Sequence, residues 1–205
     1  LGTCAVVSPT DQNRIVSTVR GTEVVSDPTN VMALECARRL GKAGPARVRL
    51  CTVHQVVRAQ RVEPRPGFSQ HFRLFALAEA GAALPAHGFE VDAVVAHVAL
   101  FWKLFDLCET LGCRFPNRKA TLFIGPGALP IAHRVRNRFQ QDLPELRIEE
   151  VSFDSHYYDG IRVLFGADST SGAHVPIADT GVFDWMAKLT SNRRHRLVAS
   201  GLGLQ

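Results

Sequence analysis

The sequence has 205 residues, of which 46% are hydrophobic and 21% are charged, and its formal net charge is +5. This length supports one sizeable hydrophobic core and leaves little room for two full domains. The composition is that of a globular protein, and no apolar run reaches the roughly 20 residues that cross a bilayer. The basic residues are dispersed along the chain, which favours a mildly basic surface over a nucleic-acid-binding tract.

The cysteines and histidines of the sequence show no pattern typical of a metal or disulfide protein. Five cysteines are present, without a Cys-x-x-Cys pair, so neither a zinc ribbon nor a secreted disulfide framework is expected. Cys36, Cys51 and Cys108 lie in apolar sequence and are predicted to be small core residues. The histidines are scattered without metal-ligand spacing. We therefore expect no metal or other cofactor, and a reducing compartment such as the cytoplasm.

The first half of the chain predicts paired strands and one helix. Asp27 before Pro28 supplies helix-start chemistry, and Gly41 marks the end of that helix. Two β-rich runs around Arg20-Gly21 read as a hairpin. The expected elements are a hairpin (15–25), a helix (to about 41), a strand (48–57), a polar loop (61–70) and a strand (72–78).

The second half adds longer helices and further short strands. After a small-residue connection (82–88), the expected elements are a helix (90–111), a strand (120–124), a basic amphipathic helix (131–143), three strands (147–151, 161–165, 174–178), a short helix (181–189) and a strand (196–200). The strands and helices lack a regular strand–helix–strand rhythm. This order predicts the α+β class, a mainly antiparallel sheet of about six strands flanked by helices.

Two segments near the carboxyl end carry the most specific pattern. Tyr157-Tyr158-Asp159-Gly160 reads as a tight aromatic–glycine turn, and Gly181 reads as a glycine turn into a helix. This layout resembles the histidine-recognition region of histidyl-tRNA synthetases, where Tyr-Tyr-x-Gly and Gly-Gly-Gly-Arg-Tyr-Asp segments wall the amino-acid pocket. The resemblance implies that Tyr157, Tyr158, Asp179 and Gly181 line a ligand pocket. The residues alone also allow the two tyrosines to alternate in a strand, one in the core and one outside.

The same resemblance extends to the start of the first helix. The family carries a glutamate and a threonine that hold the substrate amino group, and Asp27 and Thr29 fall at those positions. A carboxylate facing an ammonium group is a sound binding device. The alternative makes Asp27 the N-cap of the helix and Thr29 a first-turn residue.

A third similar segment covers residues 48–58 and is similar to motif 2 of class II synthetases. The resemblance places Arg58 at the arginine that contacts the α-phosphate of ATP, and Gln60 at the glutamate that reads adenine. Further on, Arg73 matches the arginine of an Arg-x-Phe-x-Gln segment, while Leu77 falls on its pocket glutamine. The implied ligand-contacting residues here are Arg58 and Arg73.

Several groups that the family uses for catalysis are replaced. Phe153 falls on the catalytic arginine, and Gly201-Leu202-Gly203 resembles motif 3 without its arginine. Loss of one preorganised charge typically lowers a rate by roughly two to three orders of magnitude. The resemblance is therefore closest in kind to the non-catalytic regulatory subunit of ATP phosphoribosyltransferase, which senses histidine in histidine biosynthesis. It implies one synthetase-like domain over 1–205, without a recognisable motif 1 or anticodon-binding domain.

The expected partners follow from this resemblance. They are a protein partner, such as a catalytic phosphoribosyltransferase subunit, or a second copy of the chain, with weak binding of an amino acid or nucleotide and no tRNA. A pocket with Asp27 and Asp179 but no cation should prefer a cationic group, unless an arginine such as Arg73 pairs with those anions. Two alternatives stay open: an active histidine–tRNA ligase-like enzyme that forms an aminoacyl adenylate, and a structural subunit with a vestigial pocket.

Overall fold

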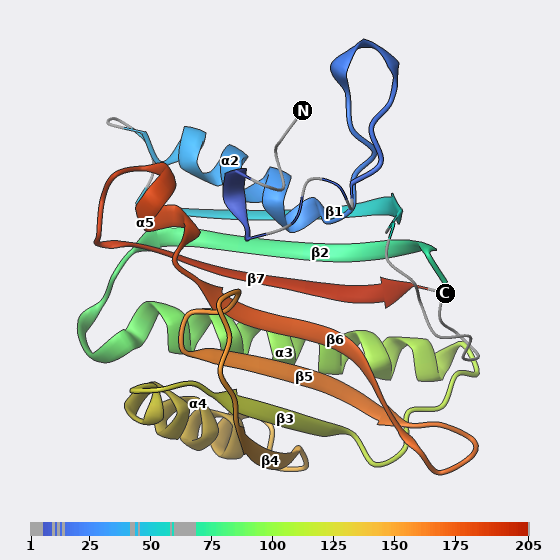
Figure 1. Ribbon diagram of the computed structural model, residues 1–205. Helices are drawn as coiled ribbons and strands as arrows, with labels where there is room; N and C mark the ends of the chain where they lie inside the picture. The colour runs from blue at the N-terminus through green and yellow to red at the C-terminus, as the bar shows by residue number, and fades with distance from the viewer. Residues whose placement is uncertain are drawn as a thin grey trace.

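The computed structural model describes residues 6–9, 11, 13, 15–41, 44, 46–57, 59 and 69–204. Its centre is a seven-stranded sheet in the order β1-β2-β7-β6-β5-β3-β4 (Figure 1). The strands are β1 (Arg47–Val57), β2 (His71–Ala82), β3 (Lys119–Ile124), β4 (Arg147–Ser152), β5 (Ile161–Asp168), β6 (His174–Phe183) and β7 (His195–Leu204). Neighbouring strands are antiparallel except for the parallel pair β3–β4. The predicted α+β class is confirmed, with seven strands rather than about six.

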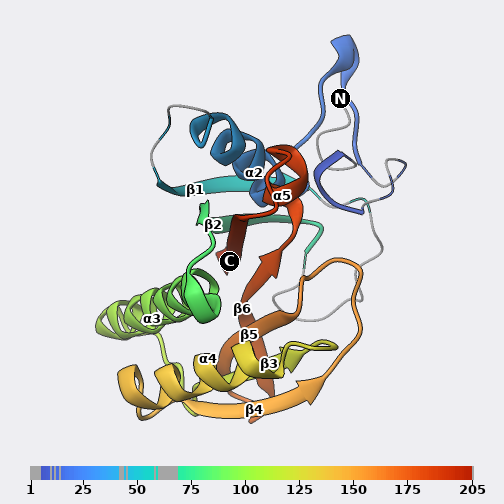
Figure 2. The same ribbon diagram turned by 90° about the vertical axis from the view of Figure 1, so that its left-hand side faces the viewer.

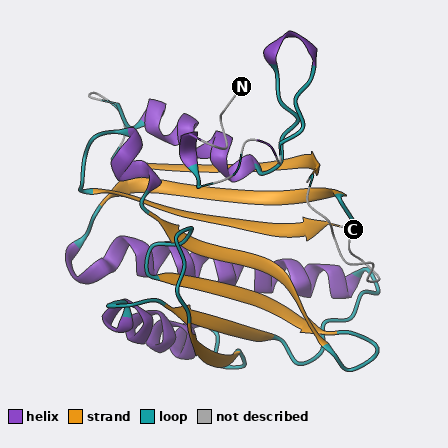
Figure 3. Cartoon of the chain, viewed as in Figure 1, coloured by secondary structure: helices purple, strands orange, loops and turns teal. Residues whose placement is uncertain are grey.

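Helices cover both faces of this sheet. They are α2 (Pro28–Arg39), α3 (Gly88–Thr110), α4 (Leu129–Asp142) and α5 (Trp185–Leu189), with short 3₁₀ turns at η2 (Val19–Gly21) and η3 (Pro85–His87). The long helix α3 passes behind the central strands in the view of Figure 3 and packs against β2, β6 and β7, while α4 packs against α3 and β3. Helices α2 and α5 pack on the opposite face. We call these the α3 face and the α2 face.

The alternation of β2 separates the two hydrophobic cores. Leu77 belongs to the core under α3, whereas Ala76, Ala78 and Ala80 belong to the core under α2. Because β2 is buried on both faces, its sequence is a nearly continuous apolar run rather than an alternating one. The small alanines let α2 approach this part of the sheet closely, and the larger core side chains gather under α3 and α4.

Three expectations about local structure need correction. The predicted hairpin over residues 15–25 is present, with backbone hydrogen bonds from Thr18 to Thr22 and from Val24 to Val16, but it has one isolated bridge, Ser17 to Glu23, and a turn at η2 in place of two regular strands. The segment projects from the sheet at the blue end of Figure 1. Gly181 does not begin a helix, because β6 continues to Phe183 and α5 begins at Trp185. In the same way β7 continues as a strand through residues 201–204.

Only one of the three cysteines that were predicted to lie in the core is buried. Cys36 is buried as predicted, but Cys108 is half-buried and Cys51 is exposed. Cys51 is on the sheet-edge strand β1, at a position that α3 does not cover. Most of the predicted polar loop (residues 60–68) lies outside the described residues. Within the described part of the chain, no helix has the length and apolar character needed to cross a membrane.

Candidate functional site

The candidate pocket segments meet on the α2 face, where the loop of residues 153–160 joins β4 to β5. Figure 2 shows this loop on the side of the sheet opposite α3. The Asp159 N–H donates to the Val182 carbonyl of β6 (2.8 Å), and the Ser155 hydroxyl accepts the N–H groups of Tyr157 and Tyr158 (3.1 and 3.3 Å). Gly160 has φ +84°, a left-handed conformation that favours glycine. These bonds form the tight turn that the sequence predicts, and the two tyrosines lie in the loop rather than in a strand.

The ring of Tyr158 lies directly over Gly181 of β6. A Cβ atom at Gly181 would lie 2.3 Å from Cδ1 and 2.5 Å from Cε1 of Tyr158, well inside van der Waals contact. Glycine at this position therefore admits a close neighbour, as the family resemblance implies, but the neighbour is a side chain of the protein itself. The space above Gly181 is filled by Tyr158.

Asp179, two residues before Gly181, is held by two partners. The Tyr158 hydroxyl donates to Asp179 Oδ2 (2.9 Å), and Arg162 of β5 donates from Nη2 to Oδ2 (2.6 Å) and from Nε to Oδ1 (3.0 Å). The Arg162 guanidinium also lies 5.0 Å from the centre of the Tyr158 ring, a cation–π distance. The sequence-based expectation of a site without a cation is therefore wrong, because Arg162 supplies one.

The electrostatics of this group follow from burial and charge. Burial raises the pKa of Tyr158, and the negative charge of Asp179 raises it further, so the phenol stays protonated and donates its hydrogen bond. The nearby charge of Asp27 acts in the same direction, which places Asp27 close to this cluster. Burial alone would lower the pKa of Arg162, but its bonds to Asp179 outweigh burial and raise it. Arg162 and Asp179 thus form a charged pair.

Aromatic side chains surround the charged pair. The members of this aromatic cluster are Phe123, Phe153, Tyr157, Tyr158, Phe183 and Trp185. The Phe153 ring centre lies 5.8 Å from that of Phe123 and 6.3 Å from that of Tyr158. Phe153 is the residue that the resemblance places at the catalytic arginine. An apolar ring here packs against its neighbours and offers no charge to a reacting group.

Asp27 and Thr29 are joined at the start of α2. Asp27 Oδ1 accepts the Thr29 N–H (2.9 Å) and the Thr29 hydroxyl (2.7 Å), so Asp27 is the N-cap of the helix. This geometry satisfies one of the free N–H groups of the first turn. The capping interpretation of this segment is confirmed, and the cap engages one of the two carboxylate oxygens of Asp27, Oδ1.

The fold of this chain is similar to the folds of several solved structures, although no sequence match was found. No protein-family model matches the chain, and no curated protein matches it in sequence. Solved structures do match: histidyl-tRNA synthetase of S. aureus (TM-score 0.65, 10% identity, 92% of this chain and 52% of that one) and threonyl-tRNA synthetase ThrRS-1 of Aeropyrum pernix (0.67, 13%, 98% and 50%). A third is an ATP phosphoribosyltransferase regulatory subunit/histidyl-tRNA synthetase of Bacillus halodurans (0.61, 12%, 97% and 68%).

The chain has a histidyl-tRNA synthetase-like class II fold. At 10–13% identity this likeness concerns the fold alone. The chain spans about half the length of the two synthetases, at 52% and 50% of each. In the sheet, the two motif 2-like strands, β1 and β2, are followed by the last strand, β7, whereas β5, the strand that follows Tyr157 and Tyr158, is separated from β7 by β6.

The class II fold also allows the motif 2-like residues to be located. Arg58 lies outside the described residues. Arg73 is exposed on β2. It points to the same side of the strand as Phe75 and Leu77, which pack on the α3 face. By strand alternation, Arg73 therefore belongs to the face opposite Asp179, and the expected pairing of Arg73 with that anion is replaced by Arg162.

Leu77 also faces away from the candidate site, so it does not stand in for a pocket glutamine. Leu74 of β2 lies on the α2 face instead, and its methyl groups would lie 3.2 Å from a Cβ atom placed at Gly201 of β7. Sequence reasoning missed both Leu74 and Arg162. The alternation of Ile161, Arg162 and Val163, with both apolar residues buried, was the signal that could have placed Arg162 on the open face.

A second polar cluster lies under α3, and no pattern in the sequence indicated it. His97 Nδ1 is 2.6 Å from Ser200 Oγ, and the Ser200 hydroxyl donates to Thr180 Oγ1 (2.9 Å). His97 Nε2 lies 3.8 Å from Glu79, which also pairs with Arg49 (2.8 Å). Burial lowers the pKa of His97 to about 4, so the imidazole is neutral at pH 7. Ser, His and Glu also occur together in hydrolases, but these three side chains are buried, and they form part of the core.

Metal chemistry finds no support in the described part of the chain. No group of three histidine, cysteine or acidic side chains there lies close enough together to hold a metal ion. What the candidate site offers is an aromatic floor, one internally paired carboxylate and one capping carboxylate. A ligand can occupy the space over Gly181 only if Tyr158 moves away from it.

Proposed function

We propose that this chain is a catalytically silent relative of histidyl-tRNA synthetase that acts as a regulatory or assembly subunit. The observation that supports the proposal is that the protein's own side chains fill the space where the resemblance implies an amino-acid pocket. Tyr158 covers Gly181, and Arg162 neutralises Asp179. The fold shared with the Bacillus halodurans regulatory subunit/histidyl-tRNA synthetase supports the direction of the proposal.

The chemistry of adenylation explains why such a site should be silent. Attack of a carboxylate on the α-phosphate of ATP builds negative charge, which an enzyme stabilises with fixed cations. The resemblance places Phe153 where the family has one such cation, and its ring packs against the rings of Phe123 and Tyr158. Arg162 donates to both oxygens of Asp179, so reaching a phosphate would require it to leave that carboxylate. Each of these changes opposes catalysis independently.

The test of silence is pyrophosphate exchange with ATP and each amino acid. We expect no exchange above background with any amino acid, histidine included. Clear turnover with histidine would instead establish the histidine–tRNA ligase-like alternative, and the proposal would fall. The Phe153→Arg variant should be assayed in parallel. Weak pyrophosphate exchange that appears only in this variant would identify the missing cation as one cause of the lost activity.

The regulatory part of the proposal needs a partner and a ligand measurement. Copurification with a catalytic phosphoribosyltransferase subunit, expressed together with this chain, would support the regulatory role. Failure to copurify with it would leave a structural subunit with a vestigial pocket as the better account. Calorimetry with histidine measures the pocket directly, and we expect weak binding or none because Tyr158 must first move.

The matched variant for calorimetry is Asp27→Asn rather than Asp27→Ala. Asparagine caps a helix about as well as aspartate, so this change removes the charge near Tyr158 and keeps α2 intact. Micromolar histidine binding that is lost in Asp27→Asn would show that the pocket opens and uses this carboxylate, contrary to our expectation. Binding unchanged in this variant would place histidine at a different site.

A further inference from the structure

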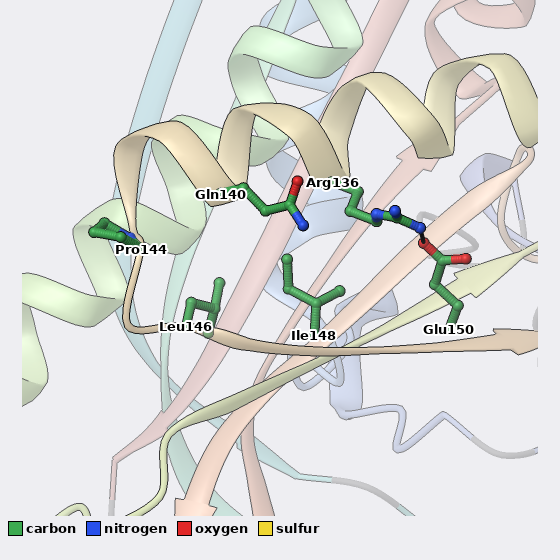
Figure 4. A pocket seen from close by; sticks show the side chains of 6 residues that line it. All are labelled: Arg136, Gln140, Pro144, Leu146, Ile148 and Glu150. Carbon is green, nitrogen blue, oxygen red and sulfur yellow. Dashed lines mark hydrogen bonds and ion pairs between the residues drawn. The ribbon is translucent and has the colours of Figure 1, made fainter.

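The sheet ends at β4, a six-residue strand whose outer edge carries no neighbouring strand of the described chain. A groove runs between this edge and α4, lined by Arg136, Gln140, Pro144, Leu146, Ile148 and Glu150 (Figure 4). We propose that two copies of this chain pair through β4, antiparallel, about a two-fold axis at Ile148. The inference does not depend on the proposed function.

The backbone of β4 presents its free groups at the residue through which the axis would pass. The Phe153 N–H donates to the Ile124 carbonyl of β3 (3.2 Å), so the odd-numbered residues of this strand direct their N–H and C=O groups towards β3. Because these directions alternate along a strand, Ile148 and Glu150 direct theirs away from the sheet. An antiparallel pair centred on Ile148 would exchange two N–H···O=C bonds between Ile148 and the partner's Ile148.

Side-chain charge favours pairing centred on Ile148 over pairing centred on an adjacent residue. Antiparallel pairing sets residues of the same sheet face opposite each other. Centring the pair on Glu149 or on Glu150 places a carboxylate against its own copy, which is destabilising. Centring it on Ile148 instead places an isoleucine against an isoleucine in the groove, and Arg147 against the partner's Glu149 on the other face.

On the face of β4 that carries Arg147 and Glu149, the charges within the described part of one copy of the chain are not fully paired. Arg147 is directly opposite Lys119 in the β3–β4 register, so two positive charges are neighbours there. Glu149 reaches diagonally to Lys119 (Nζ to Oε2, 2.9 Å). In the paired state Glu149 would lie between Lys119 and the partner's Arg147, and each Arg147 would gain the carboxylate that its own strand does not place opposite it. The axis thus creates two complementary charge pairs.

The experiment is a charge exchange read by sedimentation equilibrium over a range of protein concentration. A short edge strand should give a modest affinity, with a dissociation constant of roughly 10–100 µM. Wild type should show a monomer–dimer equilibrium. Arg147→Glu alone and Glu149→Arg alone each set like charges opposite each other, and each should weaken dimerisation at least about tenfold. The double exchange of both residues restores opposite charges and should restore the dimer.

Controls separate pairing from general charge effects. Glu145→Arg makes the same charge change next to the strand, at an exposed position without a charged residue opposite in this register, and should leave dimerisation unchanged. A thermal melt of every variant checks that the fold is intact. A wild type that stays monomeric at several hundred micromolar, a dimer that both single variants leave unchanged, or a double exchange without recovery would each overturn the proposal.

Discussion

The two faces of the sheet are filled in different ways. Under α3, a long helix closes a core whose polar groups, His97, Ser200 and Thr180, bond to one another. On the α2 face, α2 and α5 pack over β1, β2 and β7, but the space over Gly181 of β6 is filled from a loop, because Tyr158 is carried by residues 153–160. The first face is closed by regular secondary structure, whereas the part of the second face over β6 is closed by a short segment whose Asp159 N–H donates to the Val182 carbonyl of β6.

This difference shows where function could reside in the fold. Opening the α3 face would require displacement of a 23-residue helix and its core. Opening the space over Gly181 on the α2 face would require movement of one loop, with the Arg162–Asp179 pair left in place. Loops are the segments in which local opening costs least. The α2 face is therefore where a ligand or partner could be accommodated, and the predictions below test whether the two faces differ in this way.

The largest effect is expected in the core under α3. Phe165 is 1% exposed and its ring centre lies 4.9 Å from that of Phe105. We expect Phe165→Ala to lower the free energy of unfolding by about 3–5 kcal/mol through lost burial and a cavity. Chemical denaturation measures this. Leu107→Ala, at an exposed position of α3, is the control and should change the free energy by less than about 0.5 kcal/mol.

The buried imidazole should make stability depend on pH. The pKa of His97 is about 4 in the folded protein and 6.5 without burial, so below pH 6.5 the unfolded chain binds a proton that the folded chain does not. Stability should fall from pH 6.5 to pH 4 by roughly 3 kcal/mol on this account and no further below pH 4. Denaturation of His97→Gln should lack this component, while His87→Gln, an exposed control, should keep it.

The filled pocket predicts a coupling between Gly181 and Tyr158. We expect Gly181→Ala to lower the free energy of unfolding by about 1–3 kcal/mol, because the new methyl group meets the tyrosine ring. In a Tyr158→Ala background the same change should cost little, since the ring is gone and alanine suits a strand better than glycine. A double-mutant cycle measures the coupling. Equal costs in both backgrounds would show that Tyr158 does not occupy this space.

The smallest effect is expected at the phenol–carboxylate bond. Tyr158→Phe removes one hydrogen bond to Asp179, while Arg162 still pairs with that carboxylate, so we expect a loss of about 1 kcal/mol. The two ion-pair side chains are 28% and 35% exposed, and solvent screening keeps their own contribution modest. In an Asp179→Ala background the Tyr158→Phe change should be close to neutral. An undiminished effect there would assign the loss to packing.

Several local features followed from the sequence because they depend on residues close in the chain. The Asp27 cap and the end of α2 near Gly41 arise from side chains next to the helix termini. Strand β1 and helix α3 follow from β-branched content and helical spacing over long windows. The turn ending at Gly160 follows from the need for a left-handed residue. Local chemistry is sufficient for each of these.

The contents of the candidate site depended on strand register, which no local pattern reveals. Arg162 and Asp179 are 17 residues apart and meet because β5 and β6 pair with Arg162 opposite Gly181. Gly181 suggested a turn, yet it is a strand residue that admits a large neighbour, Tyr158, and Gly201 of β7 admits Leu74 in the same way. A glycine in the sequence is equally consistent with a turn and with a strand position that a neighbouring side chain approaches closely.

The sequence by itself determined the class of this protein: its helices, most of its strands, the capped start of α2 and the aromatic–glycine turn. Only the tertiary structure decided which face each side chain occupies. Strand β2 is buried on both faces, so its apolar run could not show that Leu77 faces α3 and Leu74 the candidate site. Face assignment depends on pairing between distant strands, and a shift of one residue would reverse it.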